Sequence, residues 1–88
     1  MGTNEKERLI SGSTDTLATL VFEKIDRATE DAEFIDAPAL TRDIFEMEGT
    51  VGELLITREF GAVCGAIDFL IDEGSIAFNT DDGNLTRV

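Results

Sequence analysis

The sequence predicts a small α+β domain that is mostly helical, with three or four helices and a C-terminal β-hairpin. Two features of its last third predict this class. Apolar residues recur at helical spacing between positions 60 and 71, and a glycine then stops the helix. Two short runs suited to strands follow, and an acidic turn joins them.

The stretch 60–71 carries one apolar stripe, because its apolar residues share one side of a 3.6-period helix. These residues are Phe60, Val63, Cys64, Ile67, Leu70 and Ile71. Gly74 lies just past the stripe and adopts the left-handed conformation at little cost, so we expect the helix to end there. Residues 75–79 and 85–88 predict the two strands, and the turn residues of 81–84 connect them.

The first helix is expected to begin near Asp15, with Ser13 and Thr14 as alternative N-caps, and to fade near positions 31 and 32. Its predicted buried stripe is Leu17, Leu20, Val21, Ile25 and Ala28, with Phe22 at the flank. We interpret residues 1–14 as a flexible N-terminal lead-in and residues 15–88 as the folded domain. A chain of 88 residues has room for one domain with a modest core.

A second helix is predicted to begin at Asp36 and Pro38, because proline is tolerated in the first turn of a helix. It should run to about Met47. The apolar residues that mark it are Ala39, Leu40, Ile44 and Phe45.

Two connecting segments are less regular. Residues 33–36 predict one edge strand, with Phe34 or Ile35 facing the core. Residues 48–57 leave two interpretations open. They form either an extra helical turn between the second and third helices or the early part of a longer third helix.

Acidic residues dominate the charge, since 19 Asp and Glu against 7 Lys and Arg give a net charge of −12. The apolar fraction of 42% is that of a folding sequence and not of a disordered acidic tail. The composition resembles that of proteins from salt-accumulating halophilic archaea. There, molar salt shortens the Debye length to about 3 Å and screens self-repulsion. An acidic mesophilic domain is the alternative interpretation.

Nothing in the sequence predicts a membrane or secreted protein. No stretch approaches the roughly 18 apolar residues that a membrane-spanning helix needs. The mixed-charge N-terminus carries neither a signal peptide nor a myristoylation motif. Cys64 is the single cysteine, and its place on the apolar stripe predicts a buried hydrophobic residue. We therefore expect a cytoplasmic protein.

The residue types that most catalysis needs are missing. The chain contains no histidine, tyrosine or tryptophan, and no Gly-rich phosphate-binding motif. One cysteine without histidine excludes a zinc site in practice. Residues 79–84 have some features of a calcium-binding loop, but Phe78 would occupy the first ligand position and no glutamate closes the loop. We therefore do not expect the chain to be an enzyme or to bind a cofactor or a metal.

In chain order, helix, short strand, helix, helix and hairpin cover residues 15–88. The segment 60–76, which runs from the apolar stripe through Gly74 into the first strand, resembles the third helix and wing of winged helix-turn-helix domains. The whole order is similar to that of small acidic haloarchaeal transcription regulators. The resemblance implies a DNA-binding transcription regulator of a halophilic archaeon or its virus. Such a protein lays its third helix in the major groove of duplex DNA, while the wing reaches the backbone or the minor groove.

The resemblance also indicates which residues would contact double-stranded DNA. Arginine side chains suit phosphate oxygens, and hydroxyl side chains can add contacts. The predicted DNA-binding residues are Thr41, Arg42, Thr57, Arg58 and Arg87. Because this set is small and Glu59 and Asp68 repel phosphate, a monomer would bind weakly. We therefore expect a homodimer that presents two such sets.

A protein-interaction module without DNA binding is the alternative interpretation. In it, the arginines form surface pairs with neighbouring acids. The residues expected to hold the protein partner are Leu9, Ile10, Leu54, Leu55 and Phe69. Gly61 and Gly65 have the spacing of a small-xxx-small pair, which in this setting indicates close packing against another helix of the chain or of a partner.

Overall fold

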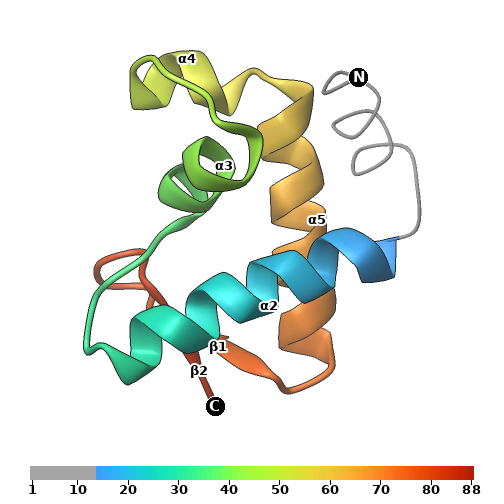
Figure 1. Cartoon of the computed structure of the whole chain (residues 1–88), viewed down its shortest axis with the longest axis vertical. Helices are drawn as coiled ribbons and strands as arrows, with labels where there is room; N and C mark the ends of the chain where they lie inside the picture. Colours follow the sequence, from blue (N-terminus) through green and yellow to red (C-terminus); the bar gives the residue numbers. More distant parts are fainter. Residues whose placement is uncertain (1–13) are drawn as a thin grey trace.

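The computed structural model describes residues 14–88, which form four helices and one two-stranded antiparallel hairpin (Figure 1). The elements are α2 (Thr14–Glu30), α3 (Ala37–Phe45), α4 (Val51–Leu55), α5 (Arg58–Asp72), β1 (Ile76–Phe78) and β2 (Leu85–Arg87). The predicted α+β class with a C-terminal hairpin is confirmed. The predicted lead-in, residues 1–14, lies outside the described residues except for Thr14, which begins α2. None of the described helices combines the length and the apolar character that crossing a membrane requires.

Helix α5 is the element against which the others pack. Figure 1 shows α2 crossing α5, α3 and α4 beside its N-terminal half, and the hairpin beside its C-terminal half. One core cluster joins these elements, and its residues are Leu17, Ala18, Val21, Ile25, Leu40, Phe45, Val63, Ala66, Ile67, Leu70, Ile76 and Leu85. The hairpin is therefore part of the same core as the helices.

The buried side of α2 differs from the predicted stripe at one position. The residues buried as predicted are Leu17, Val21, Ile25 and Ala28. Leu20 is only half-buried, and Ala18 is buried instead. The reason is that α5 packs across α2, and Ala18 belongs to the core cluster on that side.

The edge strand predicted at residues 33–36 does not form, and that prediction was wrong. One hydrogen bond joins this segment to the hairpin, from the Leu85 N–H to the Ile35 carbonyl at 2.8 Å. A single bond does not make a ladder, so the sheet has two strands. Ile35 packs against the core, whereas Phe34 is 78% exposed.

Helix α3 begins where the sequence predicted. The Asp36 carboxylate accepts a hydrogen bond from the Ala39 N–H at 2.9 Å, and Pro38 lies in the first turn. The helix ends at Phe45, short of the predicted end at Met47, because Glu46 adopts the left-handed conformation with φ 53°.

Helix α4 decides between the two interpretations of residues 48–57, since it is a separate short helix between α3 and α5. The hydroxyl of Thr50 caps it by accepting a hydrogen bond from the Glu53 N–H at 3.2 Å. Thr57 then caps α5 in the same way, through the Phe60 N–H at 3.1 Å. Each helix has its own cap, so the chain turns between them.

Helix α5 extends over the predicted residues, but its buried side is rotated from the predicted stripe. The residues buried as predicted are Val63, Ile67 and Leu70. Ala66 is buried as well, while Phe60 and Cys64 are half-buried and Ile71 is 39% exposed. The prediction of a buried Cys64 was therefore wrong. Packing of α2 on α5 brings the Ala66 side inward, which turns Cys64 and Ile71 outward.

The hairpin is shorter than predicted, with Ile76 paired to Arg87 and Phe78 paired to Leu85. Ile76 and Leu85 are buried and anchor one strand each in the core. Gly83 provides the positive φ of 77° that the turn needs.

Candidate interaction face

One side of α5 points away from the core, and we call it the outer face of α5. Residues three and four positions apart share a side of a helix. Gly61, Gly65, Asp68 and Asp72 do so, and all four are exposed. Within residues 14–88, a Cβ added at Gly61 or Gly65 would meet no atom within 4 Å. Another backbone can therefore approach the middle of this face, and its C-terminal end is acidic.

An apolar groove of about 280 Å³ lies where α5 meets the hairpin and the start of α3. We call it the α5–hairpin groove, and its lining residues are Ala37, Cys64, Ile67, Asp68, Ile71, Phe78 and Leu85. Two large side chains that border it are well exposed, Phe78 at 50% and Ile71 at 39%. Asp68 is the single charged residue among these lining residues. The groove therefore offers an apolar surface with one carboxylate.

The thiol of Cys64 is half-buried in this groove. Burial raises the pKa of the Cys64 thiol, and the nearby Asp68 carboxylate raises that pKa further. The thiol thus stays protonated at neutral pH, which makes it a weak nucleophile. Among the described residues, no group of three or more His, Cys, Asp or Glu could hold a metal ion.

Two predicted DNA-binding residues, Thr41 and Arg42, lie on α3. The Thr41 side chain is 0% exposed, and its hydroxyl donates to the Ala37 carbonyl at 2.9 Å. A hydroxyl in this position does not reach a ligand. The Arg42 guanidinium donates to the Gly49 carbonyl at 2.8 Å, so it holds the loop between α3 and α4.

Thr57 and Arg58 lie together at the N-terminal end of α5. Besides capping α5, the Thr57 hydroxyl donates to the Leu54 carbonyl at 2.6 Å. Its one hydrogen-bond donor is thereby used within the chain. Arg58 is the first residue of α5 and is exposed. Of the five predicted residues, Arg58 is thus the exposed one that lies on the same side of α5 as Gly61 and Gly65.

Arg87 lies at the other end of the domain, on the α2 side of the hairpin. Its guanidinium pairs with Asp26 and, at 3.2 Å, with Glu30, both on α2. The hydrogen bonds that the Arg87 guanidinium donates to the Asp26 and Glu30 carboxylates raise the pKa of Arg87. The structure therefore does not bring the five predicted residues together, because the length of α5 separates Arg58 from the hairpin (Figure 1).

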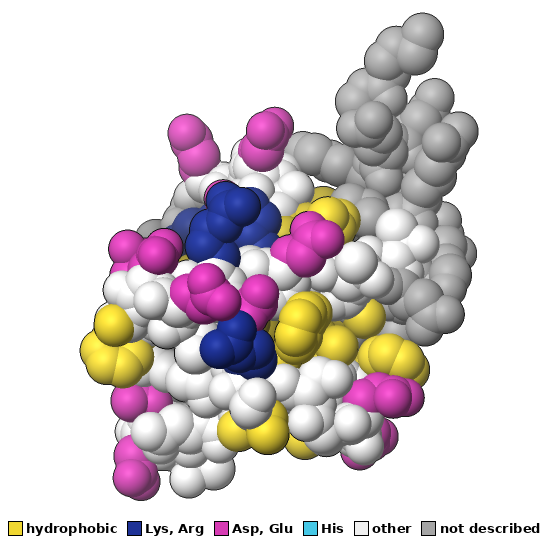
Figure 2. Space-filling model, turned by 60° about the horizontal axis from the view of Figure 1, so that its bottom comes forward, with side chains coloured by type: hydrophobic (Ala, Val, Ile, Leu, Met, Phe, Trp, Pro, Cys, Tyr) yellow, Lys and Arg dark blue, Asp and Glu magenta, His cyan; other side chains and the backbone are white. Residues whose placement is uncertain are grey.

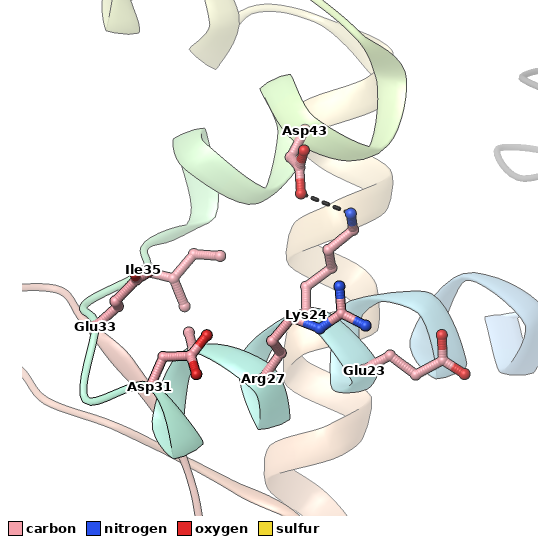
Figure 3. Close-up of a pocket in the computed structure, with 8 residues that line it drawn as sticks. Glu23, Lys24, Arg27, Asp31, Glu33, Ile35 and Asp43 are labelled. Atoms are coloured by element: carbon pink, nitrogen blue, oxygen red, sulfur yellow. Dashed lines mark ion pairs between the residues drawn. The ribbon is translucent and has the colours of Figure 1, made fainter.

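Other basic side chains are also surrounded by acids. Figure 2 shows basic side chains gathered in two places on one face, with acidic side chains bordering both. In Figure 3, Lys24 of α2 reaches toward Asp43 of α3, and the two form an ion pair of 2.7 Å. This pair lies in a cleft of about 410 Å³ that is lined by Glu23, Lys24, Arg27, Ala28, Asp31, Glu33, Ile35 and Asp43. Carboxylates outnumber bases there, so the cleft does not attract an anion.

The apolar residues expected to hold a protein partner have different positions. Leu9 and Ile10 lie outside the described residues. Leu54 is buried and Phe69 packs against the core, whereas Leu55 is exposed.

Sequence reasoning missed Ile71 and Phe78 as exposed apolar residues. Strand alternation gave no signal for the exposure of Phe78, because it places Phe78 on the same side of the hairpin as the buried Ile76. Ile71 had no signal either, because its exposure depends on the rotation of α5.

Comparisons with known proteins do not assign this chain to a family. The sequence matches no protein-family model, no curated protein and no solved structure.

Proposed function

We propose that this chain is a winged-helix domain that binds a protein partner through the outer face of α5 and the adjoining hairpin. The order α2, α3, α5 and hairpin supports the winged-helix layout. In that layout the third main helix and the wing form the ligand-binding side. The α5–hairpin groove is the observation that carries the proposal, because an apolar groove with one carboxylate suits a protein surface.

Charge opposes binding of duplex DNA by the same side. Asp68 and Asp72 lie on the outer face of α5, and Asp81 and Asp82 lie in the hairpin turn. Duplex DNA carries one negative charge per roughly 1.7 Å of helix axis, so these carboxylates repel it. Arg42 and Arg87, which could offset the repulsion, already have partners within the chain.

In molar salt, to which the acidic composition is suited, a second effect opposes binding of duplex DNA. Each phosphate contact contributes a slope of about −0.9 to the logarithm of affinity against the logarithm of salt concentration. Three contacts would lose roughly 500-fold in affinity over a tenfold increase in salt. The affinity that comes from burying apolar surface does not fall in this way, and salts that are excluded from the protein surface strengthen it. The α5–hairpin groove is thus the more effective contact under those conditions.

Duplex DNA remains a second candidate ligand because of the N-terminal end of α5. Arg58 is exposed there, and the open surface at Gly61 admits a close approach to base edges. In this candidate the domain is a dimeric transcription regulator that reads DNA with the first turns of α5.

Capture from an extract of the source cells, at molar potassium chloride, tests the proposal. The bait is the immobilised chain in three forms: unaltered, Phe78→Ser, and Phe34→Ser as control. Phe34 is an exposed phenylalanine away from the groove, so its replacement removes apolar surface without altering the face. We expect one protein to be held by the unaltered chain and by Phe34→Ser and lost from Phe78→Ser. Equal capture by all three forms contradicts the proposal.

Mobility of a labelled random-sequence duplex, at low and at molar salt, tests the second candidate. Binding that Arg58→Ala removes would establish DNA as the ligand. Binding that Arg58→Ala leaves unchanged would remove Arg58 from the site. Absence of binding at low salt, where phosphate contacts are strongest, excludes this candidate.

A further inference from the structure

We infer that the α5–hairpin groove binds an amphipathic segment of the partner that inserts an apolar side chain and places a lysine or arginine on Asp68. This inference rests on the proposed function and specifies the chemistry of its partner. It follows from the shape of the groove, from the position of its one carboxylate and from the surface beside it.

The size of the groove limits what can enter. Its volume of about 280 Å³ lies just below the range of ligand-binding pockets, which begins at about 300 Å³. Ile71 and Phe78 border it and are the large exposed side chains that an inserted residue would cover. One or two side chains of leucine, isoleucine or phenylalanine would cover this surface, which suits a segment of a protein.

The carboxylate determines the charge of the segment. Asp68 lines the groove, and Asp72 follows it one helical turn later on the same side of α5. Among the residues that line the groove there is no base to pair with Asp68. At molar salt the Debye length is about 3 Å, so the charges that still interact are those in direct contact. A partner cation beside the inserted apolar residue makes such a contact, whereas acids elsewhere on the chain are screened.

The middle of the outer face indicates how the segment lies. Among residues 14–88, no atom fills the space beside Gly61 and Gly65, on the N-terminal side of Asp68. A helix laid along α5 can approach closely there while its apolar side enters the groove. A second copy of this chain fits less well, because the same face would set Asp68 and Asp72 against their own counterparts.

Cys64 provides a direct report on the groove, since it is the only cysteine of the chain and lines the groove. A molecule seated in the groove would cover the thiol and slow its alkylation by a maleimide. Binding and alkylation can therefore be measured on the full chain without adding a label elsewhere.

The test uses two synthetic helical peptides with identical leucines at i, i+3, i+4 and i+7. One peptide carries flanking lysines and the other carries glutamates at the same positions. We expect the lysine peptide to bind at low salt and to slow alkylation of Cys64 at least fivefold, while the glutamate peptide does neither. Asp68→Asn should weaken binding of the lysine peptide roughly fivefold at low salt, which is the upper range for a surface ion pair, and by less at molar salt, where the exposed pair is screened.

Glu23→Gln is the matched control, because it removes one exposed carboxylate from α2, away from the groove. It should leave binding of the lysine peptide unchanged. Thermal unfolding of both variants verifies that they fold like the unaltered chain. An equal effect of Asp68→Asn and Glu23→Gln would overturn the role of Asp68 as the pairing site.

The remaining outcomes separate this inference from the proposed function. If neither peptide binds, or both bind equally, the partner chemistry is wrong, while Phe78-dependent capture of a cellular protein would still support the proposed function. If Cys64 becomes protected as the chain itself is concentrated, a second copy occupies the groove and the inference is overturned. If duplex DNA protects Cys64 and the peptides do not, both proposals are overturned.

Discussion

Ala32 and Gly74 occupy the same position in two equivalent helix ends. Both are left-handed, with φ 57° at Ala32 and 77° at Gly74. In each case the residue's own N–H donates to the carbonyl three positions back, and the next N–H donates to the carbonyl five positions earlier. This is the hydrogen-bond pattern of a Schellman motif, so α2 and α5 end in one geometry with two different residues.

The first prediction follows from the Cβ of alanine, which costs roughly 1–2 kcal/mol in the left-handed region. Part of that cost is offset by the greater freedom of glycine in the unfolded chain, about 0.5–1 kcal/mol. We therefore expect Ala32→Gly to raise the free energy of unfolding by about 0.5–1 kcal/mol. Gly74→Ala should lower it by a similar amount, about 0.5–1 kcal/mol, because the same two terms act in the opposite direction. Denaturant unfolding at one fixed salt concentration measures both changes.

Gly65→Ala is the control for the effect of alanine itself. Gly65 lies within α5, is exposed and has open space where a Cβ would be added. Alanine there should stabilise by about 0.8–1 kcal/mol, because it has the higher helix propensity. The same substitution thus has opposite signs at Gly65 and at Gly74. Two changes of the same sign would contradict the assigned helix end.

The second prediction concerns the pairing of Arg87 with Asp26 and Glu30, which joins β2 to α2. Arg87→Gln should lower the melting temperature at low salt, and the loss should shrink as salt is raised, because these groups are exposed to solvent. Arg27→Gln is the control, since the described residues offer Arg27 no ion-pair partner. An equal loss in both variants, or a loss independent of salt, would show that net charge or packing is responsible.

The third prediction uses the raised pKa of Cys64. Its ordinary value is 9.0, and burial followed by the Asp68 carboxylate raises it in the folded chain. Between the unfolded and the folded pKa, the folded state binds more protons, so stability falls as pH rises through this window. Thermal unfolding measured at and above pH 9.0 should therefore show a decline that Cys64→Ala removes.

The rate at which Cys64 is alkylated is a second measure of its raised pKa. The thiolate is the reactive form, so the folded thiol should react more slowly at a given pH than the thiol of the unfolded chain. Asp68→Asn removes one of the two causes and should shift the rate profile toward lower pH without returning it to the ordinary value. An unshifted profile would show that burial alone raises the pKa.

Local signals in the sequence were sufficient for α2, α3, α5, the hairpin and several helix ends, but they wrongly predicted an edge strand at residues 33–36 and left α4 undecided. The start of α3 at Asp36 and Pro38 and the end of α5 at Gly74 depend on hydrogen bonds and backbone angles within a few residues. These helix ends can therefore be predicted without knowing the fold. The rotation of α5 could not be predicted in this way. Ala66 and Ile71 are both apolar, and which of them faces the core depends on where α2 crosses α5.

The candidate site was harder to predict because polar side chains find distant partners. Thr41 suited a surface contact by residue type, yet its hydroxyl bonds to the Ala37 carbonyl one turn earlier and its side chain is buried. Arg87 finds its carboxylate partners on α2, far away in sequence. Such pairs depend on the tertiary fold, and no local spacing indicates them.

The fourth prediction tests whether the charge of the hairpin turn prevents binding of DNA. If Asp81 and Asp82 repel phosphate at the tip of the hairpin, replacing both by lysine should create affinity for a random-sequence duplex. Two new phosphate contacts would give a salt slope of about −1.8.

The control is Asp31→Lys with Glu33→Lys, which changes the net charge equally but lies in the cleft around Lys24 and Asp43. Binding by the hairpin variant alone would show that the hairpin faces DNA when its charge permits. Equal binding by both variants would show that net charge is sufficient, and the orientation of a winged-helix ligand side would then lose this support.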